Sequence, residues 1–170
     1  MKDLNIMFVI KRNGNSEKVQ FDKISDRINK LINKDEKSVI DNGLISQKVI
    51  QALYSGITTE EVDVESAKIS MNMSTIHPTY GNIAGRILVS NLHKKTTLNF
   101  VDKMNFIQKD TVYHGKNLLD ESWLKWINEN KDDINDIIDY TRDYNLDFFA
   151  FKTLERAYLI KNLETNHIYE

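Results

Sequence analysis

The stretch that most constrains the fold is residues 7–23, which read MFVIKRNGNSEKVQFDK. Apolar and polar residues alternate on both sides of Asn13-Gly14, and such alternation is typical of β-strands with one covered face. An Asn-Gly pair suits a two-residue type I′ turn, because both central positions need positive φ. We therefore predict a β-hairpin with strands over Met7–Arg12 and Glu17–Phe21.

A hairpin alone is marginal in water, so this one must pack on helices or gain another strand. Four helical patterns follow it. The first begins at Asp22 as N-cap, the second ends near Gly56, the third opens with a capping box at Thr58 and Glu61, and the fourth begins after Pro78. The sequence thus predicts an α+β, mainly α domain over residues 1–95, in which a small β-sheet or hairpin caps a four-helix bundle.

Residues 96–170 form a second predicted region with a different character. Helical spacing continues over 99–108, and apolar residues from Trp123 to Ile138 indicate one more helix. The segment 147–160 is aromatic and apolar, with Lys152, Glu155 and Arg156 interleaved. We predict a second, helical domain here.

Composition excludes several classes of function. The 170 residues carry 23 basic and 25 acidic side chains, a mixed surface that does not favour nucleic acid as a partner. Cysteine is absent, which excludes thiol catalysis and thiolate metal sites. The four histidines lack a zinc-ligand spacing, and no GxxxxGK[ST] or GxGxxG motif occurs. No apolar run approaches the ~20 residues of a membrane span. We predict no catalytic residue, no metal site and no membrane contact, in a soluble, cytoplasmic chain.

The cations Lys11, Arg12 and Lys23, with Glu17 among them, are the remaining candidates for chemistry. On an edge strand, such charges block edge-to-edge pairing, and from composition alone this interpretation is favoured. The alternative is an anion site. Lys23 falls in the first turn of a helix, where a cation does not stabilise the helix but free amides attract phosphate.

Four blocks of the sequence resemble a known protein family. These are VIKRNGNSEKVQFDKI, KVIQALYSGITTEEVD, HPTYGNIAGRILVSNLHK and FFAFKTLERAYLI. In this order they resemble the ATP-cone and the start of the catalytic domain in the large subunit of class I ribonucleoside-diphosphate reductases. The resemblance covers the chain from Met7 on. One departure is the Asn13-Gly14 turn, where the family often has Asp-Gly, a change that keeps the turn chemistry.

The resemblance implies a set of nucleotide-contacting residues. Those on the hairpin and the first helix would meet the triphosphate and the base, Thr59 and Asp63 would touch the nucleotide, and Lys94 would contact phosphate. Without the resemblance, these last three would be read as ordinary helix-terminal residues. The full implied set is Lys11, Arg12, Glu17, Lys18, Val19, Gln20, Phe21, Asp22, Lys23, Ile24, Thr59, Asp63 and Lys94.

The function implied by the resemblance is allosteric. ATP would activate and dATP inhibit the enzyme, each bound with Mg²⁺. The partners would be further copies of the chain through the cone, the remainder of the large subunit and the radical-generating small subunit. The family's barrel and catalytic cysteines are absent from this sequence, so the chain alone is not expected to reduce a ribonucleotide. It would be a fragment, one piece of a split subunit or an isolated domain.

Two alternatives stay open at this point. A helical interaction or oligomerisation module that does not bind nucleotide would share the same helical patterns. A transcriptional regulator with an ATP-cone would carry a cysteine zinc ribbon before the cone, and the absence of cysteine disfavours it.

Overall fold

A computed structural model describes residues 7–110, 112–113, 116–162, 165 and 167–169. The chain divides into two compact units. The first combines the residues up to Asn91 with Tyr144–Phe151, and the second combines Leu92–Asp143 with the residues from Lys152 on. Helices dominate both units, and the first also holds a small sheet, so the predicted α+β, mainly α fold is confirmed.

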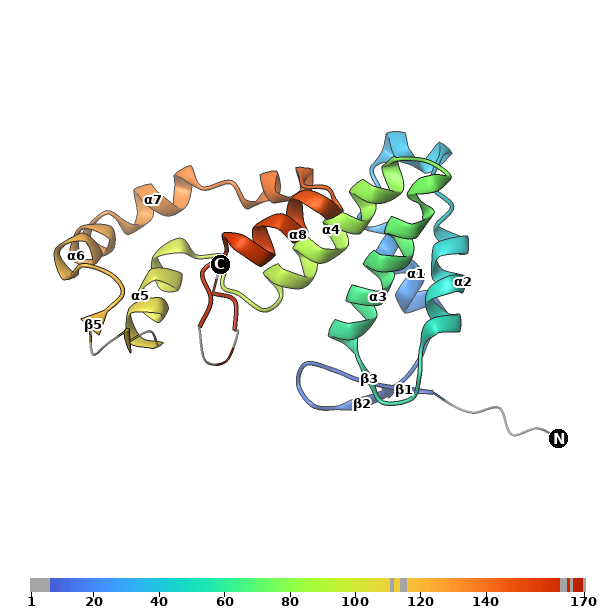
Figure 1. The fold of residues 1–170 in the computed structure, drawn as a ribbon, viewed down its shortest axis with the longest axis horizontal. Helices are drawn as coiled ribbons and strands as arrows, with labels where there is room; N and C mark the ends of the chain where they lie inside the picture. The colour runs from blue at the N-terminus through green and yellow to red at the C-terminus, as the bar shows by residue number, and fades with distance from the viewer. Residues whose placement is uncertain (1–6, 111, 114–115, 163–164, 166, 170) are drawn as a thin grey trace. The chain divides into compact units, whose positions relative to one another are not determined.

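The sheet of the first unit has three strands in the order β2-β1-β3. Strands β1 (Phe8–Ile10) and β2 (Ser16–Lys18) form the predicted hairpin, and β3 (Ile57–Thr58) pairs with β1 in parallel. The added strand supplies the support that an isolated hairpin lacks. Figure 1 shows the sheet beneath the ends of α2 and α3, the helices that flank β3 in the chain.

The hairpin turn differs from the predicted two-residue type I′ turn. The amide of Gly14 donates to the carbonyl of Lys11 (2.8 Å), and the amide of Lys11 donates to the carbonyl of Asn15 (2.8 Å). Gly14 has φ +81°, a left-handed conformation that glycine adopts without a Cβ penalty. This is the three-residue loop in which a left-handed residue follows a four-residue turn. Arg12 therefore lies in the turn and not in a strand.

The described residues 7–95 contain four α-helices, as predicted, and two 3₁₀ turns. Their bounds are α1 (Phe21–Asn29), η1 (Lys34–Ser38), α2 (Asn42–Ala52), α3 (Thr59–Asn72), η2 (Met73–Thr75) and α4 (Thr79–His93). The N-cap of α1 is Gln20, so the prediction of Asp22 as N-cap is wrong, and Asp22 lies in the first turn. The capping box of α3 is confirmed, because Thr58 Oγ1 accepts from the Glu61 amide (3.1 Å) and the Glu61 carboxylate accepts from the Thr58 amide (2.8 Å).

The core of this unit joins the helices to β3. Its most buried apolar side chains come from all four helices and the third strand, namely Ile28, Ile45, Val49, Ile57, Ala67, Ile83, Ala84 and Ile87. Removing such area from water stabilises the unit by about 25 cal/mol per Å². Helix α4 is the most deeply buried of the four, with ten buried residues.

The second unit holds α5 (Phe100–Asp110), the short strand pair β4 (Val112–Tyr113) and β5 (Lys116–Asn117), α6 (Glu121–Glu129) and α7 (Lys131–Ile137). The single helix predicted across Trp123 to Ile138 is two helices, because Asn130 adopts φ −112°, ψ 25° between them. The turn η3 (Tyr140–Asn145) and helix α8 (Phe148–Ala157) run across the boundary between the units.

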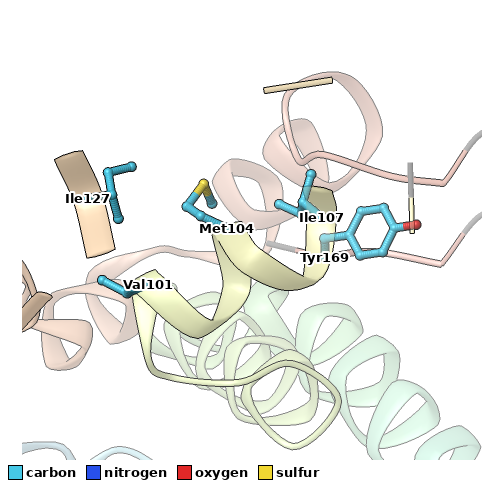
Figure 2. Close-up of a cluster of buried hydrophobic side chains, with 5 residues drawn as sticks. All are labelled: Val101, Met104, Ile107, Ile127 and Tyr169. Carbon is cyan, nitrogen blue, oxygen red and sulfur yellow. The ribbon is translucent and has the colours of Figure 1, made fainter. Parts of the chain in front are cut away.

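The core of the second unit is a small apolar cluster. Figure 2 shows Val101, Met104 and Ile107 along α5, beside Ile127 of α6 and Tyr169 near the chain end. The Tyr169 hydroxyl donates to Asp110. Burial is the main cause that raises the pKa of Tyr169, and the hydrogen bond to Asp110 adds to it. Within the described part of the chain, no helix has both the length and the apolar character needed to cross a bilayer.

Candidate functional site

Two lysines converge on one carboxylate at the hairpin. The Nζ atoms of Lys11 and Lys23 both contact Glu17. Hydrogen bonds from Lys11, which has the larger effect, and from Lys23 lower the pKa of the Glu17 carboxyl to about 2. Val9 pairs with Glu17 and with the buried Ile57, so Glu17 lies on the face of the sheet that the helices cover. The cluster carries a net charge of about +1.

Helix α1 begins beside this cluster without a side-chain cap. Gln20, its N-cap, makes no side-chain hydrogen bond to the first turn, whereas Asp41 and Thr58 cap α2 and α3 through their side chains. The first amides of a helix lack partners within the helix and attract anions. Lys23, the third residue of α1, adds a positive side chain at the same end. The sequence-predicted anion site therefore has its cations and its helix terminus together.

Arg12 connects the hairpin turn to two helices. Its Nη2 lies 2.5 Å from Oδ1 of Asn91 on α4 and 3.5 Å from Oδ2 of Asp63 on α3. Asp63 is only 5% exposed. A buried carboxylate is costly without a cation or hydrogen-bond donors, so Asp63 and Arg12 are parts of one polar network.

Three members of that network were missed by sequence reasoning. Arg27 of α1 donates from Nε to Oδ1 of Asp63 (3.3 Å) and from Nη2 to Oγ of Ser90 (2.9 Å). Ser90 and Asn91 are both buried on α4. One signal could have found them: two adjacent polar residues interrupt the apolar pattern of α4, and Arg27 follows Lys23 by one helical turn.

The other residues of the implied set are distributed less closely. Lys18 is exposed on strand β2, one position from Glu17 and therefore on the opposite face. Val19 and Ile24 are half-buried, and Thr59 opens α3.

The remaining three members near the start of α1, Gln20, Phe21 and Asp22, are exposed. Lys94 follows the last residue of α4 and belongs to the second unit, so its role stays a prediction from the resemblance. Among the described residues, no three His, Asp or Glu side chains are grouped as metal ligands would be.

Comparison with known proteins matches residues 7–95 to the ATP cone domain family. The chain is 43% identical over 159 residues to the ribonucleoside-diphosphate reductase large chain 2 of Saccharomyces cerevisiae, covering 91% of this chain and 18% of that protein. It is 43% identical over 165 residues to the large subunit of Caenorhabditis elegans, covering 95% and 21%. The large subunit of Variola virus gives 43% over 159 residues, covering 91% and 20%.

The chain therefore spans about a fifth of the length of these relatives. The family match extends over more than half of the chain itself. It includes the hairpin, the uncapped start of α1 and the Arg12–Asp63–Arg27 network. On this match, the chain belongs to the ATP cone domain family.

Proposed function

We propose that this chain is the nucleotide-binding regulatory region of a ribonucleoside-diphosphate reductase large subunit, and that it binds ATP and dATP with Mg²⁺. The family match and the relatives named above support the regulatory role. The observation that carries the proposed site is the convergence of Lys11 and Lys23 on one carboxylate beside the uncapped N-terminus of α1.

This arrangement suits a polyphosphate for electrostatic reasons. Phosphate oxygens are acceptors of the same kind as the Glu17 carboxylate, and lysine binds phosphate as a compact charge. In the proposed complex, Lys11, Lys23 and Arg12 meet the phosphates together with the first amides of α1. Ile24 lies beside the base, and Thr59 and Asp63 touch the nucleotide.

The proposed regulation requires two states of the cone. ATP and dATP differ by one hydroxyl, and one hydrogen bond contributes about 0.5–1.5 kcal/mol, which is at most roughly tenfold in affinity. A ligand that binds two states equally shifts neither, so the two nucleotides must favour different conformations or subunit contacts. We propose that ATP favours the active form of the enzyme and dATP the inhibited form.

The proposed partners follow from the same assignment. They are the remainder of the large subunit, the radical-generating small subunit and further copies of the chain, in the cytoplasm. Self-association through the cone is supported by Phe8 and Ile10, which are 44% and 38% exposed on the outer face of the sheet. Exposed apolar side chains that lie together are typical of contact surfaces.

Calorimetric titration of the intact chain with ATP and dATP tests this proposal. We expect saturable binding of both, and a loss of about ten- to a hundredfold in affinity for Lys11→Ala or Lys23→Ala, because each removes a charge-assisted contact to phosphate. Lys30→Ala is the matched control: it removes the same charge from an exposed lysine outside the implied set, at the other end of α1, and should leave affinity nearly unchanged. In the analytical ultracentrifuge, dATP should raise the mean mass above that with ATP.

The second candidate is the interaction module without nucleotide binding, which the exposed Phe8 and Ile10 also favour. The titration separates the two. A folded wild-type chain that self-associates but takes up neither nucleotide would support the interaction module and exclude the regulatory proposal.

A further inference from the structure

Asp63 faces two arginines that come from different parts of the first unit. Its Oδ1 lies 3.3 Å from Nε of Arg27, and its Oδ2 lies 3.5 Å from Nη2 of Arg12. The Asp63 side chain is 7% exposed. Taking a carboxylate out of water is costly unless positive charge or hydrogen-bond donors accompany it. The contacts of each arginine with Asp63 therefore decide which of them can move toward a ligand.

The contacts of the two arginines are not equivalent. Arg27 lies on α1, and its side chain is 25% exposed. Its Nη2 also donates to Oγ of Ser90 on α4 at 2.9 Å. Arg12 stands on the hairpin turn, is 32% exposed, and makes its short contact to Asn91 at 2.5 Å. Its 3.5 Å contact with Asp63 is an ion pair, whereas Arg27 Nε also donates a hydrogen bond to Asp63 at 3.3 Å, and Asn91 is neutral. Arg12 can therefore move while Asp63 keeps its hydrogen bond from Arg27.

We infer that Arg27 is a positioning residue of the nucleotide site: as the fixed counter-ion of Asp63, it holds that carboxylate in place and leaves Arg12 available to the phosphates. Arg27 acts through Asp63 and Arg12 and does not itself contact the ligand. Ser90 assists by fixing the second end of the Arg27 guanidinium. This inference rests on the proposed function.

Loss of Arg27 has a predictable consequence for Arg12. With Arg27 gone, Asp63 keeps its buried charge and attracts the neighbouring guanidinium, because a close opposite charge compensates the lost hydration. Arg12 then pairs with Asp63 and leaves the phosphates. We expect Arg27→Gln to weaken ATP binding about tenfold. Arg27→Lys should give an intermediate loss, because an ammonium keeps the charge but cannot reproduce the forked contact with Asp63 and Ser90.

A double-mutant cycle on ATP affinity tests the inference. Arg27→Gln is titrated calorimetrically in the wild-type background, in Asp63→Asn and in Arg12→Ala. Because Asp63→Asn removes the charge that would capture Arg12, and Arg12→Ala removes the arginine that would be captured, the tenfold loss should shrink to less than twofold in both backgrounds. Independent sites would give the same loss in every background.

Controls keep folding separate from positioning. Each variant is titrated well below its midpoint of thermal unfolding, measured by circular dichroism. Should Arg27→Gln fail to fold, Ser90→Ala serves in its place, with a few-fold loss in affinity that again vanishes in Asp63→Asn. If the wild-type chain binds ATP but the affinity losses of the variants are additive, the inference is overturned and the proposed function is not. A folded wild-type chain that does not bind ATP overturns both the inference and the proposed function.

Discussion

At the scale of single residues, Glu17 is the unexpected member of a site proposed for an anion. Hydrogen bonds from Lys11 and Lys23 lower its pKa to about 2, below the usual 4.5, so the carboxylate stays charged throughout the neutral range. A lowered carboxyl pKa means that these contacts favour the folded chain above pH 4.5 and are lost as the pH falls toward 2. At neutral pH, Glu17 would therefore compete with the phosphates of the proposed ligand for the same two ammonium groups.

Replacing this carboxylate should strengthen binding of phosphate alone. We expect Glu17→Gln to bind inorganic tripolyphosphate a few-fold more tightly at pH 7, because Lys11 and Lys23 lose their internal partner. Calorimetric titration at low salt measures this effect. Glu65→Gln, which removes the carboxylate of the exposed Lys68–Glu65 pair on α3, is the matched control and should have little effect. Weaker binding by Glu17→Gln would show that the carboxylate assists the anion and does not compete with it.

The residue pattern predicted some of the side-chain contacts at the proposed site and not the others, because those others join residues far apart along the chain. One hairpin and the first turn of the helix after it contain Lys11, Glu17 and Lys23. Local spacing along the chain is therefore enough to predict that these side chains lie close together. Arg12 and Asn91 are 79 positions apart, and their contact depends on the packing of α4 against the hairpin turn. The Asn-Gly pair fits more than one turn type, and the extra loop residue that moves Arg12 into the turn is not encoded by that pair alone.

At the scale of elements, α4 is held by contacts at its middle as well as at its end. Arg86 donates to both carboxylate oxygens of Glu36 (2.5 and 2.9 Å), to the carbonyl of Leu31 (3.1 Å) and to the carbonyl of Tyr144 (3.3 Å). Burial would raise the pKa of Glu36, but hydrogen bonds from Arg86 and the Asn33 amide outweigh it and lower the pKa. The Arg86 side chain thus links α4 by hydrogen bonds to η1 and to residues 144–151, the later segment of the first unit.

Gly85 permits the close approach of that returning segment. A Cβ placed at Gly85 would lie 2.1 Å from the carbonyl oxygen of Leu146, and a backbone atom yields less readily than a side chain. We expect Gly85→Ala to lower the free energy of unfolding by about 1–3 kcal/mol, or several degrees in the unfolding midpoint.

Gly81→Ala on the same helix is the control for this prediction. Its Cβ would make an ordinary contact with Met71 at 3.7 Å. Alanine is favoured over glycine in a helix by about 0.5–1 kcal/mol, so this variant should be neutral or more stable. Thermal unfolding of both variants measures the difference, and equal midpoints would refute the role given to Gly85.

At the scale of the whole molecule, the helical patterns were sufficient to predict the fold class, but not every element. The two-residue strand Ile57–Thr58 is too short for any periodicity, and it pairs with a strand far back in the chain. The chain also passes between the two units within α4, η3 and α8, so a segment beyond residue 140 completes the first unit. Local sequence patterns do not reveal such a return, because it depends on tertiary packing.

Nuclear magnetic resonance of the intact, ¹⁵N-labelled chain titrated with ATP tests whether the nucleotide binds at the hairpin and the start of α1. We expect the largest amide shifts on residues 11–24 and 59–63, while amides around the Val101–Ile107 core of the second unit should stay unchanged. Adenosine, which lacks the phosphates, should shift the hairpin amides far less at the same concentration. A spectrum that ATP leaves unaltered, or shifts confined to the second unit, would contradict a nucleotide site at the hairpin and the start of α1.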